Sequence, residues 1–287
     1  MRNELPGTEQ PLSWCPATLN RDDWLIPAPD GPLEDGLADT VNARLWQGTG
    51  FVVLRGLDLD CLNDRQCAER CAHLAGQVCA PAGPRLQRSA HELLTASTAP
   101  ALPRRPPDPG SPPPPTPSGD EHLLLPHMDR GEAPEPPRLL ALLCIRPAAE
   151  GGESLLASGP ALHDRLAAEH PEALRELHQD FSFGRGPGFD RVRPVFRHDG
   201  PALRVHYNRY WIDQGQAETG RPFTPGRRTA LRAMETLLHD PALVMTLPLR
   251  RGDLLLVNNS AVLHGRTPFE DRGGPGTSRC YARVWAG

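Results

Sequence analysis

The chain has 287 residues, with 31 basic and 35 acidic side chains and a formal net charge of −4. A nucleic-acid-binding domain that works through bulk charge has a pI above about 9, whereas this sequence has a pI of about 6.3. No apolar run reaches the roughly 18 residues that a membrane-spanning helix requires, and the first ten residues are polar, unlike a signal peptide. We therefore expect a cytoplasmic protein that binds neither nucleic acid nor membrane.

The absence of lysine and the number of cysteines argue against further classes of site. All 31 basic residues are arginine, so the chain has no lysine for a Schiff base or for a P-loop. The seven cysteines are odd in number, which argues against a framework of disulfides. Cys67 and Cys71 lie near His73, but they lack the Cys-x-x-Cys spacing that is typical of zinc sites. We interpret them as small buried apolar side chains.

The first third of the chain predicts two helices around one strand. Residues 1–35 are rich in Pro, Gly and Asp and favour coil, with one short strand at most. Leucine and valine then recur every four residues, which predicts a helix that ends at Gly48. The apolar, β-branched run 51–56 predicts a buried strand, and a second helix is expected over about 63–75.

Residues 99–118 interrupt this pattern with a very high density of proline. Proline at that density forbids both helix and sheet, so we expect an extended or mobile loop. It precedes the strongest chemical motif, and a linker, a lid and an inert insertion are all open interpretations, with the inert insertion favoured.

The rest of the chain alternates between short strands and helices. Helices are expected from Pro160, again after Pro171, and from Thr224 to the residue before Pro241. Many short strands bounded by turn residues favour a β-sandwich or barrel, with helices packed outside it. The predicted strands cover residues 123–127, 139–145, 153–157, 192–197, 203–207, 243–249, 254–259 and 280–285.

Two separate segments carry side chains that can bind a metal ion. His127 and Asp129 are two residues apart, and alternate residues of a strand point to the same face. His264 lies on a later predicted strand, after the turn that follows residues 251–259. Two imidazoles and one carboxylate on one face of an octahedral metal form the ligand set of non-haem Fe(II) oxygenases. Structural zinc sites more often use sulfur.

The last predicted strand carries two arginines at a spacing of four, Arg279 and Arg283. This spacing places both guanidinium groups on one face of the strand. An arginine binds a carboxylate through two parallel hydrogen bonds and is always charged. Two arginines in one cavity therefore require two anions, and one of these can be an acidic side chain of the protein.

Together these segments, in this order, resemble the TauD/TfdA family of Fe(II)/2-oxoglutarate-dependent dioxygenases and their clavaminate-synthase-like relatives. The ordered combination is far more specific than any single piece. The resemblance rests on the sequences of residues 51–57, 126–129, 137–147, 151–154, 252–259, 263–266 and 279–283.

The resemblance implies a double-stranded β-helix, or jelly roll, which is an all-β core with flanking helices. It implies that His127, Asp129 and His264 bind Fe(II), and that Arg279 and Ser154 bind the distal carboxylate of the cosubstrate 2-oxoglutarate. O2 is then the second cosubstrate. A halogenase needs a Gly or Ala in place of the acidic ligand, so Asp129 argues against that activity.

Two departures from the family pattern bear on these roles. Ser154 stands where the group often has threonine, and it retains the hydroxyl group. The stretch between His264 and Arg279 is slightly long, so that Arg266 and Arg272 are alternatives for the carboxylate-binding role.

The primary substrate is expected to contact a different set of residues. By resemblance, Arg283 binds an acidic group of the substrate, although a structural ion pair is the alternative. Tyr207 and Asn208 belong to an aromatic and polar stretch that is predicted to line the pocket, and Glu121 and His122 precede the metal motif.

We expect one domain over residues 1–287, with a supporting part (1–98), the proline-rich loop (99–118) and the catalytic core (119–287). The predicted activity is oxidation, most simply hydroxylation, of an unactivated C–H bond in a small molecule. An amino-acid-like or natural-product intermediate, as in antibiotic biosynthesis, is the expected substrate class. The alternatives are a zinc-dependent hydrolase that uses the same three ligands, and a non-catalytic β-barrel that binds a small molecule.

Overall fold

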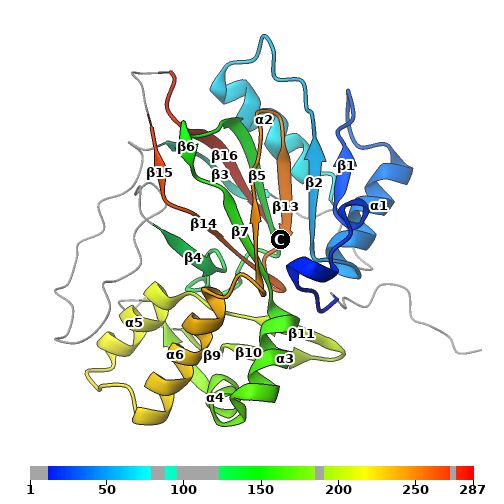
Figure 1. The fold of residues 1–287 in the computed structure, drawn as a ribbon. Coiled ribbons are helices and arrows are strands. Elements are labelled where there is room, and N and C mark those ends of the chain that lie inside the picture. Colours follow the sequence, from blue (N-terminus) through cyan, green and yellow to red (C-terminus); the bar gives the residue numbers. More distant parts are fainter. Residues whose placement is uncertain (1–11, 79–87, 96–122, 185–190, 272–275) are drawn as a thin grey trace, which may run out of the picture.

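The computed structural model describes residues 12–78, 88–95, 123–184, 191–271 and 276–287 (Figure 1). No helix in these ranges is long and apolar enough to cross a membrane. The α-helices are α1 (Asp35–Trp46), α2 (Asp64–Ala75), α3 (Gly159–Glu169), α4 (Pro171–Leu177), α5 (Arg209–Glu218) and α6 (Pro225–Leu238).

The larger of two facing sheets has six strands in the order β1-β2-β13-β5-β16-β3. All neighbouring pairs are antiparallel except β1 and β2. Three of its strands come from before the proline-rich segment and three from after it, so both parts of the sequence build the same sheet. The strands are β1 (Leu25–Pro27), β2 (Phe51–Arg55), β3 (Arg88–Thr95), β5 (Leu139–Arg146), β13 (Leu254–Asn258) and β16 (Cys280–Ala286).

The smaller sheet has four antiparallel strands in the order β12-β7-β14-β4. Short two-stranded ribbons flank it: β6 with β15, β8 with β9, and β10 with β11. The bounds are β4 (Leu124–His127), β6 (Glu150–Gly151), β7 (Ser154–Ser158), β8 (Asp180–Phe183), β9 (Arg191–Pro194), β10 (Phe196–Asp199), β11 (Ala202–Val205), β12 (Val244–Leu247), β14 (Val262–Arg266) and β15 (Phe269–Glu270).

Alternation of side chains along the strands creates three apolar layers. On β16, Ala282 and Val284 face one way, into a core shared with α1 and α2, which cover the outer face of the large sheet. Tyr281 and Trp285 face the other way, into the core between the two sheets. Helices α3 to α6 lie together below the small sheet (Figure 1) and share a third core with it. This is a jelly-roll arrangement with helices outside it.

Most predicted elements are confirmed within one or two residues, but a helix was missed. Residues 207–211 were expected to lie between a strand and a loop, whereas α5 begins at Arg209. Asn208 was the overlooked signal, because its side chain accepts a hydrogen bond from the Trp211 backbone N–H and caps the helix. The strand predicted over 192–197 is two strands, β9 and β10, which separate after Pro194.

The cysteines of α2 behave as predicted. Cys67 and Cys71 are fully buried in the core beneath the large sheet, and both are free thiols. Burial raises the pKa of the Cys71 thiol to about 12, so this thiol stays protonated and unreactive at neutral pH.

Candidate metal centre

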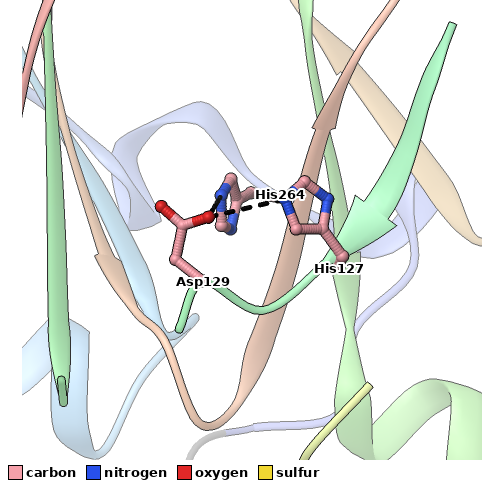
Figure 2. A group of neighbouring side chains, drawn as sticks. All are labelled: His127, Asp129 and His264. Carbon is pink, nitrogen blue, oxygen red and sulfur yellow. Dashed lines mark ion pairs between the residues drawn. The ribbon is translucent and has the colours of Figure 1, made fainter. Parts of the chain in front are cut away.

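His127, Asp129 and His264 meet between the two sheets (Figure 2). His127 is the last residue of β4, and it is directly paired with His264 of β14 across the ladder. The possible ligand atoms of the three side chains all lie within 4.8 Å of one another. One oxygen of Asp129, Oδ1, is 3.5 Å from Nε2 of His127 and 3.6 Å from Nε2 of His264. These separations exceed hydrogen-bond length and leave room for a shared cation.

Asp129 reaches this position from a turn, and not through the alternation of strand residues that predicted its place beside His127. Strand β4 ends at His127, and the chain turns so that Arg130 has a left-handed φ of 59°. The turn is held by Asn259, a fully buried residue that follows β13. Its side chain accepts a hydrogen bond from the Asp129 N–H and donates one to the Asp129 carbonyl, both at 2.9 Å.

The surroundings of the two imidazoles suit metal binding. Nδ1 of His127 lies 2.8 Å from the Leu125 carbonyl, and because a carbonyl only accepts, Nδ1 carries the proton and Nε2 keeps a free lone pair. Nδ1 of His264 is buried and has no hydrogen-bond partner among the described residues. Both Nε2 atoms face the same carboxylate oxygen, as ligands of one ion would.

The protonation states also fit a divalent cation. Burial lowers the pKa of His264, so this imidazole is neutral at neutral pH. Burial alone would raise the pKa of Asp129, but the Arg283 guanidinium and the two imidazoles outweigh it and hold that pKa well below its usual range. A neutral imidazole at His264 and an ionised carboxylate at Asp129 are forms that bind a metal. This donor set, without sulfur, fits Fe(II).

Arg279 is a buried cation without an acidic partner among the described side chains. It directly precedes β16 and is 8% exposed. Its guanidinium carbon lies 4.1 Å from the ring centre of Tyr281 and 5.2 Å from that of Phe269, and its Nε has no hydrogen-bond partner in the described part of the chain. Burial lowers its pKa. A buried charge is costly unless it is paired, so this site calls for an external anion.

The segment that contains Ser154 passes beside this arginine. Ser154 is a buried residue at the start of β7, two residues after Gly152. A Cβ added to Gly152, which has a φ of 75°, would lie 3.4 Å from Nε of Arg279. Of the two alternative arginines, Arg266 donates to the Thr267 carbonyl, and Arg272 lies outside the described residues. The contacts therefore favour Arg279 as the anion-binding arginine.

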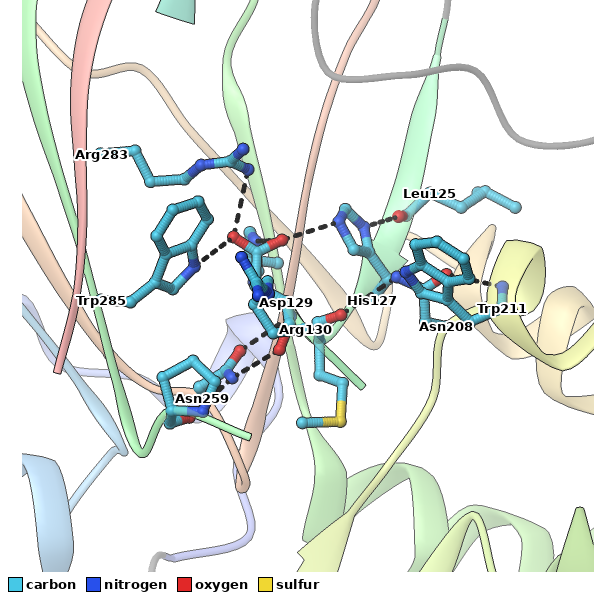
Figure 3. A network of polar contacts seen from close by, with 12 residues as sticks. Leu125, His127, Asp129, Arg130, Asn208, Trp211, Asn259, Arg283 and Trp285 are labelled. Carbon is cyan, nitrogen blue, oxygen red and sulfur yellow. Dashed lines mark hydrogen bonds and ion pairs between the residues drawn. The ribbon is translucent and has the colours of Figure 1, made fainter. Parts of the chain in front are cut away.

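Arg283 pairs with two acidic side chains of the protein. Its Nη1 donates to Oδ2 of Asp129 at 3.1 Å (Figure 3), and its Nη2 pairs with Glu92 of β3. Of the two anion sources considered for this arginine, the structure supplies the acidic side chains. Trp285, two residues further along β16, also donates from its indole Nε1 to Oδ2 of Asp129, at 3.0 Å.

The contacts of Tyr207 and Asn208 differ from the pocket lining that was predicted for them. The Tyr207 ring is 1% exposed and packs in the core with helices α3 to α6. Its carbonyl accepts the Met128 N–H at 2.7 Å, and Asn208 donates to the Met128 carbonyl at 3.1 Å. Both residues therefore hold the backbone at Met128, between His127 and Asp129. Glu121, His122 and the segment 99–118 lie outside the described residues.

His206, which precedes Tyr207, makes the free energy of unfolding depend on pH. Its side chain is buried, and burial together with Arg193, Arg197 and Arg204 lowers its pKa to about 3. In the unfolded chain a histidine has a pKa of about 6.5. The folded state stays neutral while the unfolded state takes up a proton, so His206 lowers the free energy of unfolding by about 1.4 kcal/mol per pH unit below pH 6.5.

We therefore expect His206→Gln to flatten the dependence of the free energy of unfolding on pH between 6.5 and 5, measured by urea titration. His239→Gln is the matched control, because His239 ends α6 at the surface. An equally steep pH dependence in His206→Gln and in the parent protein would contradict the assignment.

Comparisons with known proteins agree with this geometry. The model of the family described as "Taurine catabolism dioxygenase TauD, TfdA family" matches residues 25–285. FR-33289 synthase of Streptomyces rubellomurinus (strain ATCC 31215) is 28% identical over 158 residues, or 52% of this chain and 47% of the relative. A uridine-5'-phosphate dioxygenase of Streptomyces sp is 34% identical over 140 residues, or 45% of this chain and 49% of the relative. The chain spans about half the length of the curated relatives it matches.

Solved structures share the fold at low sequence identity. The non-heme iron oxygenase OrfP, solved in complex with Fe, has a TM-score of 0.58 at 16% identity over 88% of this chain and 79% of its own. Asparagine oxygenase (AsnO) has a TM-score of 0.58 at 20% identity over 88% and 78%. These matches confirm the predicted jelly-roll fold. Since the family model covers nearly the whole chain, this protein belongs to the TauD/TfdA family of dioxygenases.

Proposed function

We propose that the protein is an Fe(II)- and 2-oxoglutarate-dependent dioxygenase. The observation that carries the proposal is a two-histidine, one-carboxylate cluster on the same jelly roll as a buried arginine that lacks an acidic partner among the described residues. The cluster fits Fe(II), and the arginine fits one carboxylate of a dicarboxylate cosubstrate. A zinc hydrolase built on the same three ligands would leave Arg279 without a purpose.

Each part of the site has a task in this activity. His127, Asp129 and His264 hold the metal ion, while Arg279 and Ser154 bind the distal carboxylate of 2-oxoglutarate. When bound, iron supplies the oxidising chemistry, with 2-oxoglutarate as the source of electrons and O2 as the oxidant. The apolar walls between the sheets, which include Tyr281 and Trp285, exclude water and fix the orientation of the reactants.

We infer that the primary substrate is a small molecule whose unactivated C–H bond is hydroxylated. The relatives support this class, because one is named for a uridine 5'-phosphate and others were solved with an arginine or asparagine derivative. An amino-acid-like or natural-product intermediate is the substrate class that we propose for this chain.

An anaerobic titration tests the proposal. We expect a visible absorption band only when Fe(II) and 2-oxoglutarate are both present, since both must bind at one centre. On exposure to O2, the loaded protein should form succinate from 2-oxoglutarate. A protein that binds Zn(II) but gives neither the band nor succinate would be the hydrolase or the binding barrel instead.

A further inference from the structure

The two oxygens of Asp129 have different surroundings (Figure 3). Oδ1 faces the Nε2 atoms of both histidines. Oδ2 points away from them and accepts two hydrogen bonds, from Nε1 of Trp285 at 3.0 Å and from Nη1 of Arg283 at 3.1 Å. Only Oδ1 of the carboxylate therefore faces the two histidines, because Oδ2 is hydrogen-bonded to Trp285 and Arg283.

The two donors to Oδ2 are themselves fixed. The Arg283 guanidinium carbon lies 4.5 Å from the ring centre of Trp285, and its other amino group pairs with Glu92 on the neighbouring strand. Trp285 is 6% exposed, and it stands two residues from Arg283 on the same face of β16. Stacking on the indole and pairing with the partly exposed Glu92 both restrict the side-chain rotamers that Arg283 can adopt.

The backbone of Asp129 is fixed as well. Asn259 forms one hydrogen bond with the N–H and one with the carbonyl of this residue, and a further one with the Pro137 carbonyl. With the backbone held, the remaining freedom of the carboxylate is rotation about its own bonds. The bonds from Trp285 and Arg283 to Oδ2 remove that freedom.

We propose that Trp285 and Arg283 are positioning residues that restrict Asp129 to binding the metal through Oδ1 alone. This inference rests on the proposed function and deepens it. A carboxylate that binds through a single oxygen leaves one more coordination position for cosubstrate and O2 than one that binds through both. In this assignment Arg283 acts on the metal ligand, whereas the family resemblance implied a contact with the substrate.

The test compares two tryptophan variants by their binding of Co(II) to the metal-free full-length protein. Trp285→Phe keeps a ring beneath Arg283 but removes the hydrogen bond to Oδ2. Trp14→Phe is the matched control, because Trp14 is equally buried and donates its indole N–H to the Thr49 carbonyl at 2.6 Å, without contact to a metal-binding residue. Calorimetry gives the affinity, and the visible Co(II) spectrum gives the coordination number.

We expect Trp285→Phe to weaken Co(II) binding about 10- to 100-fold, as is typical when a partner of a metal ligand is removed. We also expect its Co(II) spectrum to shift towards a higher coordination number, while Trp14→Phe matches the parent protein in both readouts. A purely structural role for Trp285 would lower the melting temperature and leave the spectrum unchanged, which would overturn the inference.

A second variant keeps the inference testable if Trp285→Phe does not fold. Arg283→Lys retains the charge beside Glu92 but lacks the planar guanidinium group that contacts both Asp129 and Glu92. We expect the same direction of change in Co(II) affinity and spectrum. Parent-like values in this variant would contradict the proposal while leaving the proposed function intact. A parent protein that binds neither Co(II) nor Fe(II) with 2-oxoglutarate would remove both.

Discussion

Replacing His264 with alanine should abolish metal-dependent stabilisation and succinate formation while the fold remains. His264 supplies one of three donors, and its Nδ1 has no protein hydrogen bond in the described part of the chain, so no such bond at Nδ1 is lost with the ring. The free energy of unfolding of the metal-free protein should therefore change by no more than the roughly 0.5–3 kcal/mol that is typical of single substitutions. Metal that binds only the folded state raises the melting temperature. Addition of Mn(II) or Co(II) should do so for the parent and not for His264→Ala.

The matched control for this prediction is His163→Ala. His163 is a partly buried histidine, and its Nε2 lies 3.1 Å from Nε2 of His178. It lies on α3, outside the group of His127, Asp129 and His264. It should keep both the metal-dependent rise in melting temperature and succinate formation. Near-normal succinate formation by His264→Ala would refute the ligand assignment.

Replacing Arg279 with lysine should raise the KM for 2-oxoglutarate tenfold or more. Lysine keeps the charge but loses both the planar fork and the stacking on Tyr281 and Phe269. A hydrogen bond to a charged group is worth about 1.5–3 kcal/mol, and each 1.4 kcal/mol corresponds to a tenfold change in affinity. Steady-state kinetics of succinate formation, with 2-oxoglutarate varied, measure the effect.

Arg266→Lys is the control for the cosubstrate prediction. Arg266 is also buried and contacts the same Phe269 ring, with its guanidinium carbon 4.6 Å from the ring centre. However, it donates a hydrogen bond to the carbonyl of Thr267, the next residue in the chain. We expect its KM for 2-oxoglutarate to stay near the parent value. If Arg266→Lys raises KM and Arg279→Lys does not, the carboxylate-binding arginine has been misassigned.

The sequence predicted the three residues that the structure brings together, because their side chains occur in short motifs. His127 and Asp129 are two residues apart, and His264 follows a turn and a strand whose residues are easy to identify. What the motif could not provide was the conformation. The alternation of strand residues was expected to bring Asp129 to the face of His127. A turn places it there instead, because the side chain of Asn259 binds its backbone from 130 residues away.

Two contacts around Asp129 were missed for the same reason. Trp285 on β16 donates to Asp129, and Glu92 on β3 pairs with Arg283. The two strands are brought together only by sheet pairing. Alternation along the last strand would have placed Trp285 on the same face as Arg283, so that signal was present. The pairing of Arg283 with Glu92 was not predictable, since no local pattern specifies which strand lies beside β16.

The two faces of strand β16 therefore serve different purposes, one in the candidate site and the other in the core. Arg283 and Trp285 face the site, whereas Ala282 and Val284 pack against the helices that cover the large sheet. A slip of one residue against β5 or β3 would exchange these faces, which would bury charge under α2 and place alanine beside Asp129. Inserting or deleting a residue within this strand would thus damage stability and chemistry together. Differences in substrate between relatives are then more readily made in connecting segments than along this strand.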